Sequence, residues 1–105
     1  MARVAFRLQI RPDRIADYDE AHRHVWPEML QLLKSVGISE YSIFRRGTEL
    51  FLFMHVENFE QAWQTLDQHP VNVRWQAATR PLFEPLPALE PGERLPMLKE
   101  VFYLE

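Results

Sequence analysis

The sequence contains no cysteine and only three glycines among its 105 residues. The lack of cysteine excludes a disulfide scaffold, a thiolate nucleophile and a Cys-ligated zinc site. No apolar stretch approaches the ~20 residues of a membrane-spanning helix. Charged residues at Arg3 and Arg7 interrupt the start of the chain, so we also expect no signal peptide. These absences predict a small cytoplasmic protein without a membrane partner.

Positive charge is also too sparse and too scattered for nucleic acid. The 12 Lys and Arg residues are outnumbered by 15 Asp and Glu, and no basic run could follow a phosphate backbone. Phe51 and Phe53 could imitate the aromatic pair of an RNA-binding strand, but Glu49 and Glu57 flank them. We therefore expect no nucleic-acid partner, and we expect both phenylalanines in the core or in a dimer interface.

The residues that are present suit one folded domain over 1–105. Hydrophobic residues make up 47% of the chain and aromatic residues 12%, which is enough for a small core. Alternating apolar residues predict a strand over 3–10, and a hairpin is predicted from Tyr41 to Val56 around the turn Arg46-Gly47-Thr48. Its second strand, 50–56, is apolar on both faces and should be central. A last strand is expected over 97–104.

Helical patterns fill the two intervals between these strands. Asp13 is a plausible N-cap of the first helix, which Pro27 should break into two segments that end at Gly37. Asn58 should cap the next helix, and Pro70 should open a further short helix. The prolines between 81 and 96 predict an irregular segment. The order strand, helix, strand, strand, helix, strand is that of a ferredoxin-like, split βαβ α+β fold.

Such a fold packs its helices on one face of an antiparallel sheet. The other face is left open, so it must line a pocket or be covered by a second copy of the chain. We therefore expect a homodimer.

The first predicted helix carries the clearest candidate for chemistry. Tyr18 and His22 are four residues apart and so share one face, and Trp26 follows on the same stripe. Aromatic faces can pack on the C–H surface of a sugar while O–H and N–H groups bind its hydroxyls, and an imidazole exchanges protons near neutral pH. The alternative is an amphipathic helix that packs Tyr18 and Trp26 against the sheet. Tyr41 and Trp75 could likewise be packing residues.

The histidine spacing does not favour a metal site. His22 and His24 are two residues apart, which places them on different sides of a helix. His55 and His69 have no helical partner, and no HExxH pattern occurs. We expect neither a metal nor a cofactor.

Several stretches together give the chain a family resemblance: it resembles the bacterial L-rhamnose mutarotases, dimeric enzymes that interconvert the α and β anomers of a 6-deoxy sugar. The stretches span nearly the whole chain and are Ala5-Phe6 with Gln9 and Pro12, Tyr18-(x)3-His22-(x)3-Trp26-Pro27-Glu28, Tyr41-Ser42-Ile43, His69-Pro70-Val71 to Arg74-Trp75, and Glu100-Val101-Phe102-Tyr103-Leu104. The resemblance implies a homodimer that forms a dimeric α+β barrel and needs no cofactor.

The resemblance also implies residue roles. The family histidine that matches His22 is the proton donor, and the tyrosines that match Tyr18 and Tyr41 bind the sugar. A Trp-Trp pair binds it as well, but here that pair is Trp75-Gln76, so Gln76 offers a hydrogen-bonding side chain instead. The family's polar Asn-Pro-Asp-Asn-Ser-Pro stretch is replaced by residues 85–91, PLPALEP. L-Rhamnose is the first expected monosaccharide, followed by L-fucose or another 6-deoxy hexose.

Two other functions fit the same pattern of elements. One is a monooxygenase-like enzyme built on the dimeric α+β barrel, which would use an aromatic pocket and consume oxygen. The other is a sugar-binding or regulatory module, which would bind sugar without accelerating anomer exchange.

Overall fold

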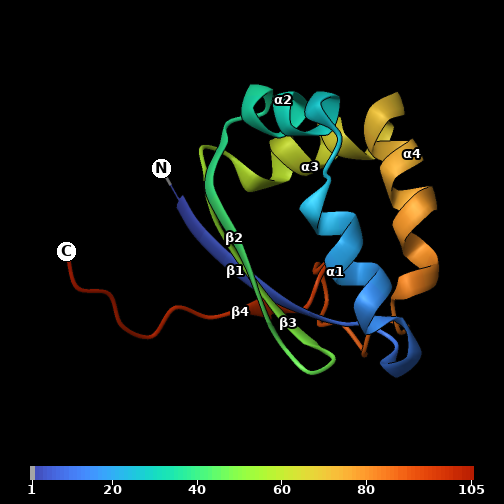
Figure 1. Ribbon diagram of the computed structural model, residues 1–105. Helices are drawn as coiled ribbons and strands as arrows, with labels where there is room; N and C mark the ends of the chain where they lie inside the picture. The colour runs from blue at the N-terminus through green and yellow to red at the C-terminus, as the bar shows by residue number, and fades with distance from the viewer. Residues whose placement is uncertain (1) are drawn as a thin grey trace.

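A four-stranded antiparallel sheet carries its helices on one face in the computed structural model, which describes residues 2–105 (Figure 1). The elements are β1 (Ala2–Gln9), η1 (Pro12–Arg14), α1 (Ile15–Arg23), α2 (Pro27–Ser35), β2 (Ile38–Arg46), β3 (Glu49–Val56), α3 (Phe59–Gln68), α4 (Pro70–Thr79), η2 (Arg80–Leu82) and β4 (Met97–Leu98). The strand order is β2-β3-β1-β4. This order confirms the predicted ferredoxin-like, split βαβ fold.

Strand β3 is central, as its apolar sequence predicts. It pairs with β1 from Ala2↔Val56 to Gln9↔Glu49, and with β2 on its other side. Alternate residues of β3 face the helices and are buried, namely Leu50, Leu52, Met54 and Val56. The helices cover this face because their own apolar residues need the same burial.

The proline-based helix breaks are confirmed. Helix α1 ends at Arg23, and Pro27 occupies the first turn of α2, where its missing N–H costs nothing. Gly37, at φ +87°, follows α2 in the left-handed conformation that a helix end favours. Asn58 caps α3 by accepting a hydrogen bond from the Gln61 N–H at 3.0 Å.

The predicted N-cap at Asp13 is wrong. Pro12 opens a 3-10 turn that contains Asp13, so α1 begins only at Ile15, and no side chain caps it. The Asp13 carboxylate lies instead 3.5 Å from the Arg11 guanidinium. The fixed φ of proline favours this turn before the helix.

The last strand is much shorter than predicted, because only Met97–Leu98 pair with β1. The register Ala5↔Leu98 would place Val101 opposite Ala2, where β1 begins, so the residues beyond 101 have no strand beside them. Side chains hold this tail instead. Arg3 pairs with Glu100 and lies 3.3 Å from the Tyr103 ring centroid. Figure 1 shows the tail leading away from the helices.

The face of the sheet opposite the helices is partly apolar. Phe44, Phe51 and Leu98 are 64%, 37% and 43% exposed. Phe53 lies on this face as well, since it alternates with the buried residues of β3. A core position is therefore wrong for Phe51 and Phe53, and the dimer interface stays a prediction. Within residues 2–105, no helix is long and apolar enough to cross a membrane.

Candidate active site

A cavity of about 580 Å³ lies between the sheet and the helices. Its wall is mostly apolar, with contributions such as Phe6 from β1, Ile43 from β2 and Leu66 from α3. Four of the five residues predicted for the site line it: His22, Tyr41, Trp75 and Gln76. A mostly apolar cavity with a few polar groups is typical of a site for a small molecule.

His22 lies on the last turn of α1 and has a defined orientation. Its Nδ1 is 3.0 Å from the backbone carbonyl of Tyr18, and a carbonyl oxygen only accepts, so Nδ1 carries the proton and donates. The imidazole stacks on the Tyr18 ring at 4.2 Å and meets Trp75 edge-on at 5.7 Å. Within the described chain Nε2 makes no hydrogen bond, so it is free to exchange a proton with a ligand.

Tyr18 is the one predicted site residue that does not line this cavity. It is 4% exposed and lies behind His22, where its ring also meets Phe83 edge-on at 5.8 Å. The structure therefore places Tyr18 as a support for the imidazole. A direct contact between Tyr18 and a sugar stays a prediction.

Both tyrosines stay protonated at neutral pH. Burial raises the pKa of Tyr41 far above its ordinary value of 10.0. Burial also raises the pKa of Tyr18, with smaller contributions from Tyr41 and Asp19. Tyr41 enters the cavity from β2, beside the register shift between Ser39 and Ser42. Its neutral phenol can donate a hydrogen bond to a ligand.

Helix α1 is tied to the sheet beside His22. The Asp19 carboxylate accepts hydrogen bonds from Nε and Nη2 of Arg45, at 2.8 Å and 2.6 Å. These bonds hold the pKa of Asp19 below its usual 3.8. This paired geometry between α1 and β2 helps to fix the helix that carries the imidazole.

Helix α4 supplies another part of the cavity wall, including Trp75 and Gln76. Trp75 packs edge-on against Trp26 at 5.1 Å, so Trp26 supports it from outside the cavity. The buried Asn72 donates to the Leu66 carbonyl at 2.9 Å, and its Oδ1 accepts from Gln76 Nε2 at 3.4 Å. Sequence reasoning missed Asn72 and also Arg80, which lines the cavity. Asn72 and Arg80 each lie four residues from Gln76 in the sequence. This helical spacing is the signal from which they could have been predicted.

The segment 83–96 closes one side of the cavity through Leu95. Arg94 ties this segment to α3 by ion pairs with Asp67 at 2.6 Å and Glu60 at 3.3 Å. Asp67 also lines the cavity, but its carboxylate accepts a hydrogen bond from Arg94. Among residues 2–105, no three His, Asp or Glu residues come together as metal ligands do.

The fold and the cavity define an α+β protein with an imidazole, a phenol and an indole facing one small-molecule site. Comparison with known proteins identifies the family. The family model described as L-rhamnose mutarotase matches residues 3–104, so the chain belongs to the L-rhamnose mutarotase family.

Individual relatives agree with this family. An L-rhamnose mutarotase of Enterococcus faecalis is 34% identical over 105 residues, which cover 99% of this chain and 100% of that protein. One from Leptothrix cholodnii is 37% identical over 98 residues, covering 83% and 92%. The crystal structure of an L-rhamnose mutarotase from Formosa agariphila matches with a TM-score of 0.79 at 30% identity, and both chains are fully covered.

A second solved structure is similar in fold alone. The tetracenomycin F2 cyclase of Streptomyces glaucescens, a type II polyketide cyclase, matches with a TM-score of 0.68 at 17% identity. It covers 100% of this chain and 97% of the cyclase. One fold thus serves different chemistries, so the residues of the cavity must decide the function.

Proposed function

We propose that this protein is an aldose mutarotase, an isomerase that interconverts the α and β anomers of L-rhamnose. The observation that carries the proposal is the oriented His22 imidazole on the wall of a mostly apolar cavity of about 580 Å³, in a chain of the L-rhamnose mutarotase family. Family membership favours this activity over the monooxygenase-like enzyme and over the sugar-binding module.

The reaction needs a proton at one oxygen and the loss of a proton at another. Ring opening breaks the bond between C1 and the ring oxygen, which gains a proton, while the anomeric hydroxyl loses its own. The resulting aldehyde rotates about the bond between C1 and C2, and closure on the other face gives the second anomer. No electron is transferred, so the chemistry requires only acid and base groups.

His22 is the proton donor in this scheme. With Nδ1 bonded to the Tyr18 carbonyl, the proton that moves is the one on Nε2 of the imidazolium. Tyr41 donates a hydrogen bond to a sugar oxygen, the Trp75 ring packs on the C–H face, and Gln76 binds a hydroxyl. Tyr18 keeps the imidazole aligned, as their 4.2 Å stacking supports.

The test is anomer exchange measured by saturation-transfer NMR on L-rhamnose, L-fucose and D-glucose. We expect exchange of L-rhamnose to be accelerated most, and His22→Ala to lose about 10²–10⁴-fold of the rate while the far-UV circular dichroism is unchanged. His24→Ala is the matched control, because His24 is exposed and, among the described residues, pairs with Glu20 alone, at 3.3 Å. A near-wild-type rate in His22→Ala would remove His22 from the role.

The working unit that we propose is a homodimer joined through the open face of the sheet. Phe44 and Phe51 are cross-strand neighbours there, and both are exposed. The tail adds further exposed apolar side chains, with Val101 at 88% and Phe102 at 79%. Apolar surface of this kind favours association with a second copy. The cytoplasmic location stays a prediction of the sequence.

A further inference from the structure

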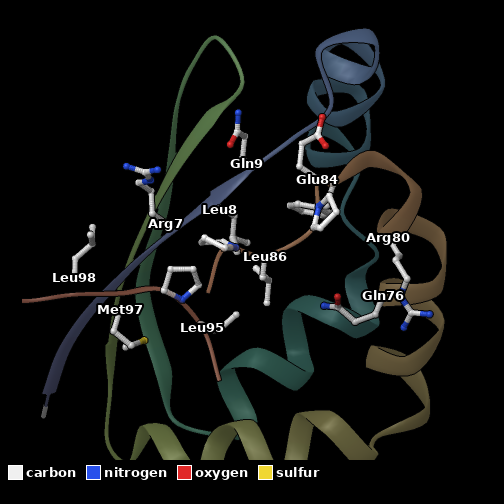
Figure 2. Close-up of a pocket in the computed structure, with 14 residues that line it drawn as sticks. Arg7, Leu8, Gln9, Gln76, Arg80, Glu84, Leu86, Leu95, Met97 and Leu98 are labelled. Carbon is white, nitrogen blue, oxygen red and sulfur yellow. The ribbon is translucent and has the colours of Figure 1, made fainter. Parts of the chain in front are cut away.

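A second cavity, of about 730 Å³, adjoins the candidate active site (Figure 2). This volume lies within the range of ~300–1,000 Å³ that is typical of small-molecule sites. Four residues line both cavities, namely Leu8, Gln76, Arg80 and Leu95. The two spaces therefore adjoin along this shared wall.

The shared wall offers polar groups that no internal partner uses. Within the described chain, Arg80 makes no ion pair or side-chain hydrogen bond, although it lines both cavities. Gln76 gives its Nε2 to Asn72, which leaves Oε1 as a free acceptor. In Figure 2 both residues come from the α4 side, and the Gln76 amide points towards Leu86 and Leu95. A donor and an acceptor side by side suit the hydroxyls and bridging oxygen of a saccharide.

The outer part of this cavity has an apolar wall and a charged rim. Leu86 provides apolar surface together with three prolines, Pro85, Pro87 and Pro96. Glu84 stands at the rim, and it forms no ion pair with another described residue. A pyranose ring presents the matching surfaces, a C–H face and a border of hydroxyls. Gln76 and residues 85–87 all line this cavity.

We propose that the second cavity is a glycosyl subsite, so that the enzyme also takes reducing disaccharides with the 6-deoxy hexose at the reducing end. This inference rests on the proposed function. Ring opening requires a free anomeric hydroxyl on the sugar beside His22. The second sugar is therefore linked through another hydroxyl and extends past Gln76 and Arg80 into the second cavity.

The test compares L-rhamnose with three disaccharides, in which L-rhamnose is linked α-1,2, α-1,3 or α-1,4 to a reducing L-rhamnose. Anomer exchange at the reducing end is followed by saturation-transfer NMR with the full-length protein. At least one disaccharide should reach a kcat/KM within about tenfold of that of L-rhamnose. Acceleration of L-rhamnose with none of the disaccharides would overturn the subsite and leave the proposed function standing. Failure with L-rhamnose itself would overturn the proposed function.

A variant that fills only the outer cavity separates the two sites. Leu86 lines the second cavity and not the first, so Leu86→Trp should lower kcat/KM for the accepted disaccharide by about tenfold or more and change that for L-rhamnose less than about twofold. Leu86→Ala keeps the space open and should retain both activities. Val73→Trp places the same side chain on an exposed part of α4 and controls for a surface tryptophan. An equal loss on both substrates in Leu86→Trp would overturn the proposal.

Discussion

His22 Nδ1 donates a hydrogen bond to the carbonyl oxygen of Tyr18, one turn earlier on α1, at 3.0 Å, while the two rings stack at 4.2 Å. Tyr18 thus fixes both the tautomer of the His22 imidazole and the plane of its ring. The hydrogen bond uses the backbone, so it survives any substitution of the Tyr18 side chain that preserves the helix. The stacking contact is lost when the aromatic ring is removed, so it can be tested separately from the hydrogen bond.

Replacement of Tyr18 should therefore affect the rate according to whether an aromatic ring remains. Tyr18→Phe keeps the stacked ring and should retain kcat. Tyr18→Leu keeps an apolar side chain but frees the imidazole to tilt, so kcat should fall by about tenfold or more with little change in KM. Steady-state anomer exchange on L-rhamnose measures both constants. Equal losses of kcat in the two variants would contradict the supporting role, and a raised KM in Tyr18→Phe would indicate a direct sugar contact.

The pair of Asp19 and Arg45 should make stability depend on pH in the acid range. The bonds from Arg45 hold the pKa of Asp19 below 3.8 in the folded protein, so the carboxylate loses its proton more readily there than in the unfolded chain. This contribution to stability is present above pH 3.8 and is lost as the pH falls through the lower folded value. Asp19→Asn should lower the urea midpoint at pH 7, and this difference should shrink as the pH falls below 3.8.

The control for this experiment is Asp17→Asn. Asp17 is on the same helix, but it pairs with Arg14 only three residues away, at 3.1 Å, and both side chains are largely exposed. Loss of such a local pair should leave the urea midpoint nearly unchanged. A difference between wild type and Asp19→Asn that stays constant from pH 7 to acid pH would show that the ion pair is not its source.

The sequence predicted the strand order and the helix breaks because local signals carry them. Pro27 and Pro70 each open a helix, and the apolar run of β3 identifies the central strand. The C-terminal strand was overpredicted for a physical reason. Alternation over 97–104 is a local pattern, whereas a strand needs a paired neighbour. Residues beyond 101 have none in β1, and residues 99–101 lie opposite β1 without pairing with it.

The sequence predicted most residues of the site, but it did not predict which of them lie behind others. Spacing of four put Tyr18 and His22 on one helical face, but it could not say that the phenol lies behind the imidazole with 4% exposure. Asn72 was missed because its importance comes from a contact with the Leu66 carbonyl across the turn between α3 and α4. The spacing of four from Gln76 places Asn72 beside that residue, but it does not reveal the contact with the Leu66 carbonyl, which depends on how two helices pack.

Asn72 and Gln76 should be coupled energetically. Because Asn72 Nδ2 donates to the Leu66 carbonyl, its Oδ1 faces Gln76, and the amide of Gln76 is thereby oriented. Gln76→Leu should raise KM for the sugar by about fivefold, since one hydrogen bond to an uncharged hydroxyl is worth about 1 kcal/mol. Asn72→Leu should also raise KM, and the double variant should lose less than the sum of the two effects. Strict additivity in this cycle would contradict the coupling.

The homodimer should depend on the open face of the sheet. Phe44 is 64% exposed and lies beside Phe51 on the adjacent strand, so a charge at this point would be buried without a partner in the proposed interface. Wild type should therefore scatter light with about twice the mass of one chain, and Phe44→Glu should shift it to the monomer. Val73→Glu, which puts the same charge on an exposed position of α4, should leave the dimer intact. A monomeric wild type, or a Phe44→Glu variant as dimeric as Val73→Glu, would place the interface elsewhere or remove it.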